Sequence, residues 1–335
     1  MKEIVVTAME AGQRLDKLLA RYLKEAPKSF LYKMLRKKNI TLNGKKADGS
    51  EKVKEADRIR LFFSEETLAK FTGTEKAGLA MQEEFPDTKL DIIYEDENVL
   101  LINKPAGMLS QKAGRQDVSL VEYVIGYLLR SGSITRENLD YFRPSVCNRL
   151  DRNTSGIVAA GKTIAGLQEL SRMFRDRAMH KYYRCLVKGE LKESCRLSGY
   201  LVKDEKRNQV RISREKQPDS QPIETEYMPV RTGNGLTLLE VKLITGRSHQ
   251  IRAHLASVGH PIVGDTKYGD EKVNERFFRE YGLKYQLLHS YRMELPKLSG
   301  ALENLSERVF LAKLPDYFQR ILDSELKKRN SSAFS

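Results

Sequence analysis

A polar turn between two short runs of strand-forming residues restricts the fold of this chain more than any other feature. It lies in Val146–Lys162, where Arg149 and Asp151 are separated by one leucine. The turn formers Asn153–Gly156 follow, and then the apolar run Ile157–Ala160. This order predicts a strand, a tight turn and a second strand. Aspartate commonly bonds to its own backbone in such turns, so the pattern alone favours a structural role for Asp151.

Two further stretches combine an apolar framework with reactive side chains. They are His180–Gly189, HKYYRCLVKG, and Thr245–Asp265, TGRSHQIRAHLASVGHPIVGD. Both contain Arg, Lys, His or Tyr residues that a fold alone does not require. We therefore expect the three stretches to form one polar site on a sheet.

The three stretches contain motifs that resemble those of the RluA-type pseudouridine synthases. The motifs are RLDxxTSG at Arg149–Gly156, K-x-Y-x-x-x-V-x-G at Lys181–Gly189 and GRxHQIRxHL with GHPIxGD at Gly246–Asp265. The KPAG run at Lys104–Gly107 is similar to the start of that family's catalytic domain. Three motifs in order are far more specific than one, and the resemblance covers roughly residues 90–320.

The resemblance implies that Asp151 is the catalytic residue and that Arg247 pairs with it. Isomerising uridine breaks the bond between C1′ and N1 and joins C5 to C1′, so no cofactor is expected. A carboxylate beside C1′ could attack the sugar or remove a ribose proton, and both routes stay open. A guanidinium would keep that carboxylate ionised despite burial. The alternative for Arg247 is a phosphate contact or a surface residue at a helix terminus.

The family analogy also assigns residues that handle the flipped base. Tyr183 would stack on it and is the third residue expected to be catalytic. Arg149 would occupy the space that the base leaves, and Arg252 and Lys181 would contact the RNA backbone. Ordinary alternatives exist, because strands favour tyrosine and Arg149 could simply pair with a phosphate.

The sequence departs from the family pattern at three positions. Asn148 stands where histidine is common, Ser248 where threonine is usual and Cys185 where alanine is usual. These changes affect the expected fine positioning of the site more than its chemistry.

The chain is basic, which favours a polyanionic partner. Its net charge is +14, and residues 1–63 hold 16 Lys and Arg against 8 Asp and Glu. Helical spacing in residues 12–23 and 28–38, followed by a hairpin at Asn43–Gly44, resembles the small S-four RNA-binding domain first named in a ribosomal protein. The expected RNA contacts in it are Arg14, Lys33, Arg36, Lys37 and Lys38. The alternative is a solvated basic face.

The remaining chain predicts an α+β fold. Helical patterns at 118–130, 163–177, 247–258 and 315–326 interrupt strands joined by hairpins, which indicates a mainly antiparallel mixed sheet with inserted helices. A small N-terminal α/β RNA-binding domain precedes it. We expect four parts: an RNA-binding domain at 1–63, an acidic linker at 64–88, a catalytic domain at 89–326 and a flexible tail at 327–335.

Several classes of site and location are not expected. The three cysteines form no C-x-x-C pair, and His249 and His254 are five residues apart, so no metal site is predicted. No apolar run approaches the length of about 18 residues that spans a bilayer, and Met1–Thr7 lacks the apolar core of a signal peptide. We expect a cytoplasmic monomer.

The resemblance thus implies an RNA pseudouridine synthase. The combination of the two domains resembles family members that modify ribosomal RNA of the large subunit, and transfer RNA is the alternative substrate. A non-catalytic RNA-binding protein in ribosome assembly is a second alternative. A nucleoside or glycoside hydrolase is a third, although such enzymes usually need a second carboxylate.

Overall fold

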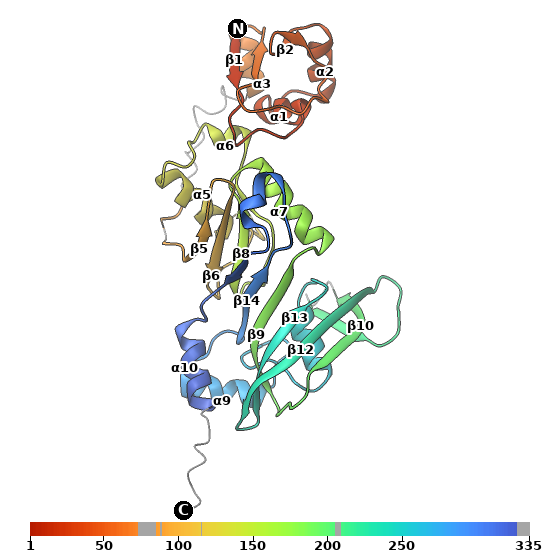
Figure 1. Ribbon diagram of the computed structural model, residues 1–335, viewed down its shortest axis with the longest axis vertical. Helices are drawn as coiled ribbons and strands as arrows, with labels where there is room; N and C mark the ends of the chain where they lie inside the picture. The colour runs from red at the N-terminus through yellow and green to blue at the C-terminus, as the bar shows by residue number, and fades with distance from the viewer. Residues whose placement is uncertain (73–84, 88, 115, 205–208, 327–335) are drawn as a thin grey trace, which may run out of the picture.

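The computed structural model describes residues 1–72, 85–87, 89–114, 116–204 and 209–326. Most of the predicted linker and the whole predicted tail at 327–335 lie outside the described residues. Figure 1 shows two folded parts, a small N-terminal part and a larger part built on a long twisted sheet.

The N-terminal part is a four-stranded antiparallel sheet in the order β1-β4-β2-β3, with two helices packed on it. The turn residues Asn43 and Gly44 have φ values of 51° and 74°, as the predicted hairpin requires. Its elements are β1 (Lys2–Val5), α1 (Leu15–Tyr22), α2 (Lys28–Arg36), β2 (Ile40–Leu42), β3 (Lys45–Lys46) and β4 (Arg58–Leu61).

A third helix, α3 (Glu65–Thr72), also packs on this part. It begins inside the segment expected to be an acidic linker. Its Leu68 and Phe71 contact the N-terminal core, and the Phe71 ring lies 4.4 Å from the ring of Phe30. The packed unit therefore continues to Thr72.

The larger part contains an eleven-stranded sheet within the described residues. Its main order is β11-β10-β12-β13-β9-β14-β8-β6-β5, with β15 beside β14 and β7 beside β8. The pair β14 and β8 is parallel and the other described pairs are antiparallel, which confirms the mainly antiparallel α+β fold. The strands are β5 (Ile92–Glu95), β6 (Val99–Lys104), β7 (Ser145–Val146), β8 (Ser155–Gly161), β9 (His180–Lys188), β10 (Cys195–Asp204), β11 (Gln209–Ser213), β12 (Gln221–Gly233), β13 (Leu236–Leu243), β14 (Leu288–Glu294) and β15 (Val309–Leu311).

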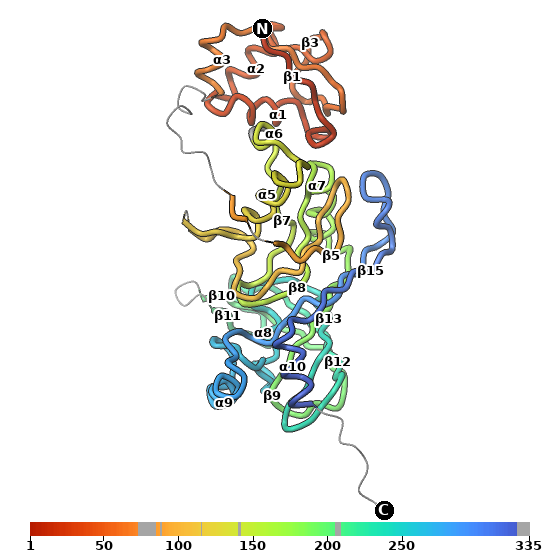
Figure 2. Tube along the Cα trace, turned by 90° about the vertical axis from the view of Figure 1, so that its left-hand side faces the viewer, coloured from red at the N-terminus to blue at the C-terminus, as the bar shows by residue number. Residues whose placement is uncertain are grey.

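Helices cover the faces of this sheet (Figure 2). They are α5 (Leu120–Arg130), α6 (Asn138–Tyr141), α7 (Ile164–Asp176), α8 (Gln250–Ser257), α9 (Glu271–Tyr281), the 3-10 helix η1 (Gly300–Leu305) and α10 (Asp316–Glu325). Alternate residues of β6 and β8 enter different cores, because successive side chains of a strand point to opposite faces. Leu100 and Val158 pack in the core that includes α5, whereas Leu101 and Ile157 pack in the core that includes α7.

The parallel pair β8 and β14 approaches unusually closely at Gly156. This glycine has a φ of +111°, and a Cβ atom there would lie 2.2 Å from the carbonyl oxygen of Ser290. A side chain at this position would thus meet both backbone strain and a clash. The glycine that ends the first motif allows the turn bearing Asp151 to lie beside β14 and, through it, beside β9.

Five elements of the larger part were not predicted, namely α6, β10, β11, α9 and η1. Strands β10 and β11 have frequent charged and polar residues, and in β10 only Leu201 is buried. Helix α9 buries only Phe277 fully. The sequence did not indicate the two strands because they lack a continuous apolar face, and it did not indicate α9 because that helix has few apolar residues.

The buried histidine of β14 makes the stability of this fold sensitive to acid. His289 is fully buried, its Nε2 atom donates to the carbonyl of Ala312 at 3.2 Å, and its Nδ1 atom accepts from the hydroxyl of Ser155 at 2.8 Å. Burial lowers the pKa of His289 to about 4. Between pH 4 and 6.5 the unfolded chain, in which the pKa of this histidine is near 6.5, is therefore protonated at His289 while the folded chain is not.

We predict that stability falls as the pH drops from 6.5 toward 4, by about 1.4 kcal/mol per pH unit from His289 alone. A His289→Asn variant keeps an acceptor but does not titrate, so its unfolding free energy should depend less steeply on pH in this window. Urea denaturation at pH 7, 6 and 5 measures the slopes, with the exposed His180→Asn as control. An unchanged slope in the His289 variant would contradict the prediction.

Candidate active site

The turn that carries Asp151 is held from one side by the loop that follows β6. The backbone N–H of Thr154 donates to the carbonyl of Asp151 at 3.0 Å and closes the turn. The Ser110 hydroxyl donates to the carbonyl of Leu150 at 2.9 Å and accepts from its N–H at 3.0 Å. The position of Asp151 is therefore fixed by backbone contacts on both sides of it.

Lys104, the first residue of the KPAG run, lies fully buried beneath this turn. Its ammonium group donates to the carbonyls of Pro105, Met108 and Arg152 at 2.9, 2.8 and 3.2 Å. Burial lowers its pKa to about 7, although the charge of Asp151 opposes this shift. Lys104 thus connects the loop after β6 to the Asp151 turn.

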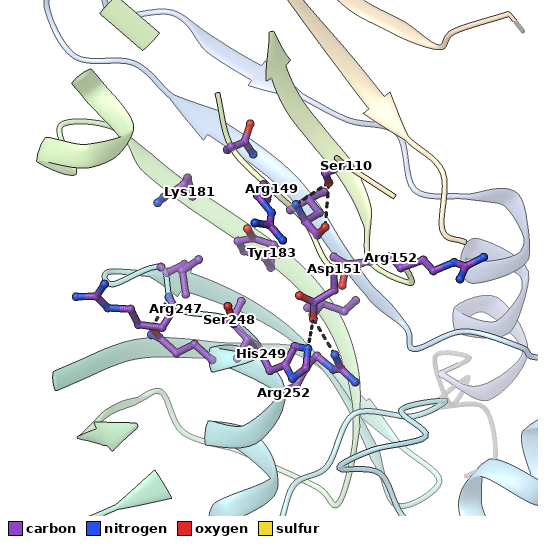
Figure 3. Close-up of a pocket in the computed structure, with 18 of the residues that line it drawn as sticks. Ser110, Arg149, Asp151, Arg152, Lys181, Tyr183, Arg247, Ser248, His249 and Arg252 are labelled. Carbon is purple, nitrogen blue, oxygen red and sulfur yellow. Dashed lines mark hydrogen bonds and ion pairs between the residues drawn. The ribbon is translucent and has the colours of Figure 1, made fainter. Parts of the chain in front are cut away.

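A cleft of about 930 Å³ opens beside the turn, and the three sequence motifs border it (Figure 3). Every residue predicted for the site of the larger domain lines it: Arg149, Asp151, Lys181, Tyr183, Arg247 and Arg252. Asp151 is the one carboxylate among the described lining residues. Eight lining residues are Lys or Arg, so the cleft is strongly basic.

Arg252, not Arg247, is the cation that pairs with Asp151. The Nη1 atom of Arg252 lies 2.7 Å from the Oδ2 atom of Asp151. The side chain of Arg247 is exposed, and Figure 3 shows its guanidinium pointing away from Asp151. The predicted pairing was wrong because α8 begins at Gln250, so Arg247 lies in the preceding turn and Arg252 in the first turn of the helix.

The prediction that Arg252 contacts the RNA backbone is corrected by the same geometry. Arg252 is 5% exposed, and its Nε and Nη2 atoms donate to the two carboxylate oxygens of Asp265 at 2.7 and 2.8 Å. Burial alone would lower the pKa of Arg252, but the two carboxylates raise it above its ordinary value. The guanidinium therefore stays charged and is occupied by carboxylates on both sides.

Asp265 orients this arginine from the interior of the protein. It is 1% exposed, and its Oδ1 atom also accepts from the N–H groups of Lys267 and Tyr268 at 2.9 and 3.1 Å. Burial would raise the pKa of Asp265, but the hydrogen bonds and charge of Arg252 outweigh it and lower the pKa. Sequence reasoning missed this residue, although the GD that ends the third motif was an available signal.

His249 is a second residue near Asp151 that the sequence did not single out. Its Nε2 atom lies 3.9 Å from Asp151 Oδ2, and its Nδ1 atom shares a hydrogen bond with the Tyr268 hydroxyl at 3.0 Å. Burial lowers the pKa of His249, against the opposing charge of Asp151. The imidazole is therefore mainly neutral at pH 7, and Arg252 provides the positive charge beside Asp151.

Tyr183 lies on β9 and is 7% exposed. Burial raises its pKa to about 12, helped by the charge of Asp151 and opposed by a hydrogen bond with Ser290. The hydroxyl therefore remains protonated at neutral pH. In Figure 3 the ring lies between Arg149 and the sheet, with Asp151 nearby.

Asn148, one of the departures from the family pattern, has a structural role. Its side-chain oxygen accepts from the N–H of Ala159 at 2.8 Å, and its amide donates to the carbonyl of Ile157 at 3.2 Å. Both contacts are to β8. An amide at this position thus joins the segment before Asp151 to the strand after it.

The basic residues predicted to bind RNA in the N-terminal domain gather around the end of α2. Lys33, Arg36, Lys37 and Lys38 are exposed, and none of them forms an ion pair with another described residue. Arg14 differs, because it forms a 2.9 Å ion pair with Asp16. RNA binding by this set stays a prediction.

Neither a metal cluster nor a membrane-spanning helix is present among the described residues. They hold no group of three or more His, Cys, Asp or Glu side chains arranged to bind a metal ion. None of the described helices combines the length and the hydrophobicity needed to cross a membrane.

The buried carboxylate Asp265 should contribute much more stability than an exposed one. We predict that Asp265→Asn lowers the unfolding free energy by about 3–5 kcal/mol, because it leaves a buried guanidinium partly uncompensated. Asp323→Asn is the control, since Asp323 is 60% exposed and 3.8 Å from Arg231, and it should change stability by less than about 1 kcal/mol. Urea denaturation at pH 7 compares the two, and equal effects would contradict the prediction.

Comparison with known proteins identifies both domains. Residues 98–257 match the family described as RNA pseudouridylate synthase, and residues 13–59 match the S4 domain. Ribosomal large subunit pseudouridine synthase C of Vibrio vulnificus is 34% identical over 294 residues, which are 84% of each chain. The protein of the same name from Vibrio parahaemolyticus is 31% identical over 90% of this chain and 93% of its own.

A solved structure supports the fold. Human RNA Pseudouridylate Synthase Domain Containing 4 is similar over 69% of this chain and 91% of its own, with a TM-score of 0.55 and 23% identity. The two sequence matches to proteins more than 30% identical decide the family. The chain therefore belongs to the RNA pseudouridine synthases and carries an N-terminal S4 domain.

Proposed function

We propose that this enzyme converts specific uridines of large-subunit ribosomal RNA to pseudouridine and that Asp151 acts on the ribose. The observation that carries the proposal is the charge pattern of the cleft: Asp151 is the one carboxylate among its described lining residues, set among eight cations. A polyanion fits such a cleft, and a single carboxylate in it marks the place of the chemistry. The names of the relatives at about 30% identity support ribosomal RNA as the substrate.

The reaction moves bonds within one nucleotide. The C1′–N1 bond breaks, the base turns, C5 bonds to C1′, and the hydrogen lost from C5 is balanced by one gained at N1. An ionised carboxylate can start this sequence by attacking C1′ or by removing a ribose proton. Arg252 supports either route, because its 2.7 Å hydrogen bond to Oδ2 holds the Asp151 carboxylate in place beside the cleft.

The other motif residues fit the handling of a flipped base. The Tyr183 ring offers a stacking surface next to Asp151, and its protonated hydroxyl can donate a hydrogen bond but cannot act as an anionic base. Arg149 is exposed at the cleft, which suits a side chain that enters the space vacated by the base. The S4 domain supplies a second RNA anchor and so raises the effective concentration of the target uridine.

Replacing the Asp151 carboxylate by an amide tests its role directly. Asp151→Asn should abolish pseudouridine formation while RNA affinity changes little, since the amide can neither attack C1′ nor accept a ribose proton efficiently. Tritium release from RNA labelled at uridine C5 measures turnover, and filter binding measures affinity in parallel. Turnover near the wild-type rate in this variant would refute the assignment.

The choice of substrate is tested in cells. A pseudouridine map of total RNA with and without this gene should lose one or more sites in large-subunit ribosomal RNA. Loss of a transfer RNA site with every ribosomal site retained would replace ribosomal RNA by transfer RNA as the substrate.

Two substitutions distinguish stacking by the Tyr183 ring from a role of its hydroxyl. Tyr183→Phe keeps the ring and should retain most of the single-turnover rate, because the proposed role is stacking. Tyr183→Leu should lower the rate about 5- to 150-fold, which corresponds to the roughly 1–3 kcal/mol of a base–aromatic stack. Equal losses in both variants would instead assign a role to the hydroxyl, for example in proton transfer at C5.

A further inference from the structure

Lys181 is a cation at the edge of the cleft without an internal partner. It is half-buried, its Nζ atom lies 5.8 Å from the centre of the Phe174 ring, and a Cβ atom on Gly246 would be 3.6 Å from it. It makes no ion pair or hydrogen bond with any described residue. Burial lowers its pKa, and the nearby charge of Arg177 lowers it further. The folded chain therefore places an ammonium group where its charge is not compensated.

Two arginines at the same cleft also lack a carboxylate partner among the described residues. Arg177 is exposed and ends α7 in the left-handed conformation, with a φ of 55°. Arg247 is exposed on the turn before α8. Neither guanidinium is paired with a carboxylate of the described residues.

Other cations close to this place in the chain do have partners. Arg172 forms an ion pair with Glu169, and Arg175 lies 3.0 Å from Asp176. Arg252 binds two carboxylates. Lys181, Arg177 and Arg247 instead have no carboxylate partner among the described residues, which indicates that an external anion supplies the missing charge.

We infer that Lys181, Arg177 and Arg247 form a binding site for a backbone phosphate of the RNA beside the target uridine. This inference rests on the proposed function of the cleft. Phosphate oxygens accept hydrogen bonds from ammonium and guanidinium groups, and such charged hydrogen bonds are stronger than neutral ones. A partly desolvated lysine gains more from an anion than a solvated one does, because its charge has lost water and has no internal partner.

The arrangement in Figure 3 fits one nucleotide placed across the cleft. Lys181 and Arg247 lie on the side away from Arg252, with Tyr183 between them and Asp151. A base stacked on Tyr183 with its ribose at Asp151 leaves a flanking phosphate at Lys181. In this arrangement Arg247 binds the substrate. Arg252 pairs with Asp151, the role that the family resemblance assigned to Arg247.

The test measures how the affinity of the full chain for RNA depends on salt. All variants carry Asp151→Asn, so binding is read without turnover, and the probes are a transcript of large-subunit ribosomal RNA and poly(U). Lys181→Met keeps the apolar stem of the side chain and removes its charge. The control is Arg172→Gln, which removes one charge from the same region but from a residue that is paired with Glu169 and does not line the cleft.

Lys181→Met should weaken binding at 0.15 M salt several-fold and reduce the slope of log affinity against log salt by about 0.7–0.9, the release expected for one phosphate contact. Arg177→Gln should do the same, Lys181→Arg should restore the slope, and Arg172→Gln should leave it unchanged. In the active background, Lys181→Met should raise KM with kcat within about twofold.

A slope for Lys181→Met equal to that of the control would overturn the phosphate site. A fall in kcat with KM unchanged would also overturn it, since that outcome assigns Lys181 to the chemistry. Thermal melting of each variant separates these results from misfolding. If ribosomal RNA proves not to be the substrate, the salt dependence of poly(U) binding still tests the phosphate site. Failure of the phosphate site can therefore be distinguished from failure of the proposed substrate.

Discussion

The buried guanidinium of Arg252 is the interaction on which the whole site depends. A charge in the interior is tolerated only when its loss of hydration is compensated, and here Asp265 provides a fully buried carboxylate with two parallel hydrogen bonds. The remaining nitrogen is then directed at Asp151, whose side chain is 26% exposed at the cleft. Asp265 holds the guanidinium of Arg252 in one orientation, and the guanidinium in turn holds the carboxylate of Asp151. The inner carboxylate serves structure and the outer one remains accessible to substrate.

The antiparallel sheet brings the parts of this network together from distant places in the chain. Asp151 precedes β8, Tyr183 lies in β9 and Ser290 lies in β14, which pairs with both strands. The close contact at Gly156 allows β8 and β14 to lie side by side. The first two motifs thus lie at neighbouring strands of one sheet. The third motif forms α8, which brings Arg252 to them from the side. Because the chain belongs to the RNA pseudouridine synthases, it is neither a non-catalytic RNA-binding protein nor a nucleoside or glycoside hydrolase.

Much of this could be predicted from the sequence because the signals were local. Helical periodicity located α5 and α7, the turn residues located the first hairpin, and three motifs identified the family and the cleft residues. The partner of Asp151 could not be predicted in the same way, since it depends on where α8 begins and hence on which arginine faces inward. Strands β10 and β11 and the packing of α3 depend on tertiary contacts of weakly patterned segments. Asp265 was missed although the GD of the third motif marked it, because its burial and its pairing with Arg252 depend on the tertiary fold.

Helix α7 joins the two RNA-binding parts of the molecule as a rod of fixed length. At its first residue, the N–H of Ile164 donates to the carbonyl of Met9 in the N-terminal domain at 3.0 Å. Its last turn carries Phe174 and leads directly to Arg177 and Lys181 at the cleft. Thirteen residues at about 1.5 Å each make this rod about 20 Å long. The helix therefore acts as a rigid spacer that keeps the contact at Met9 and the cleft residues Arg177 and Lys181 about 20 Å apart.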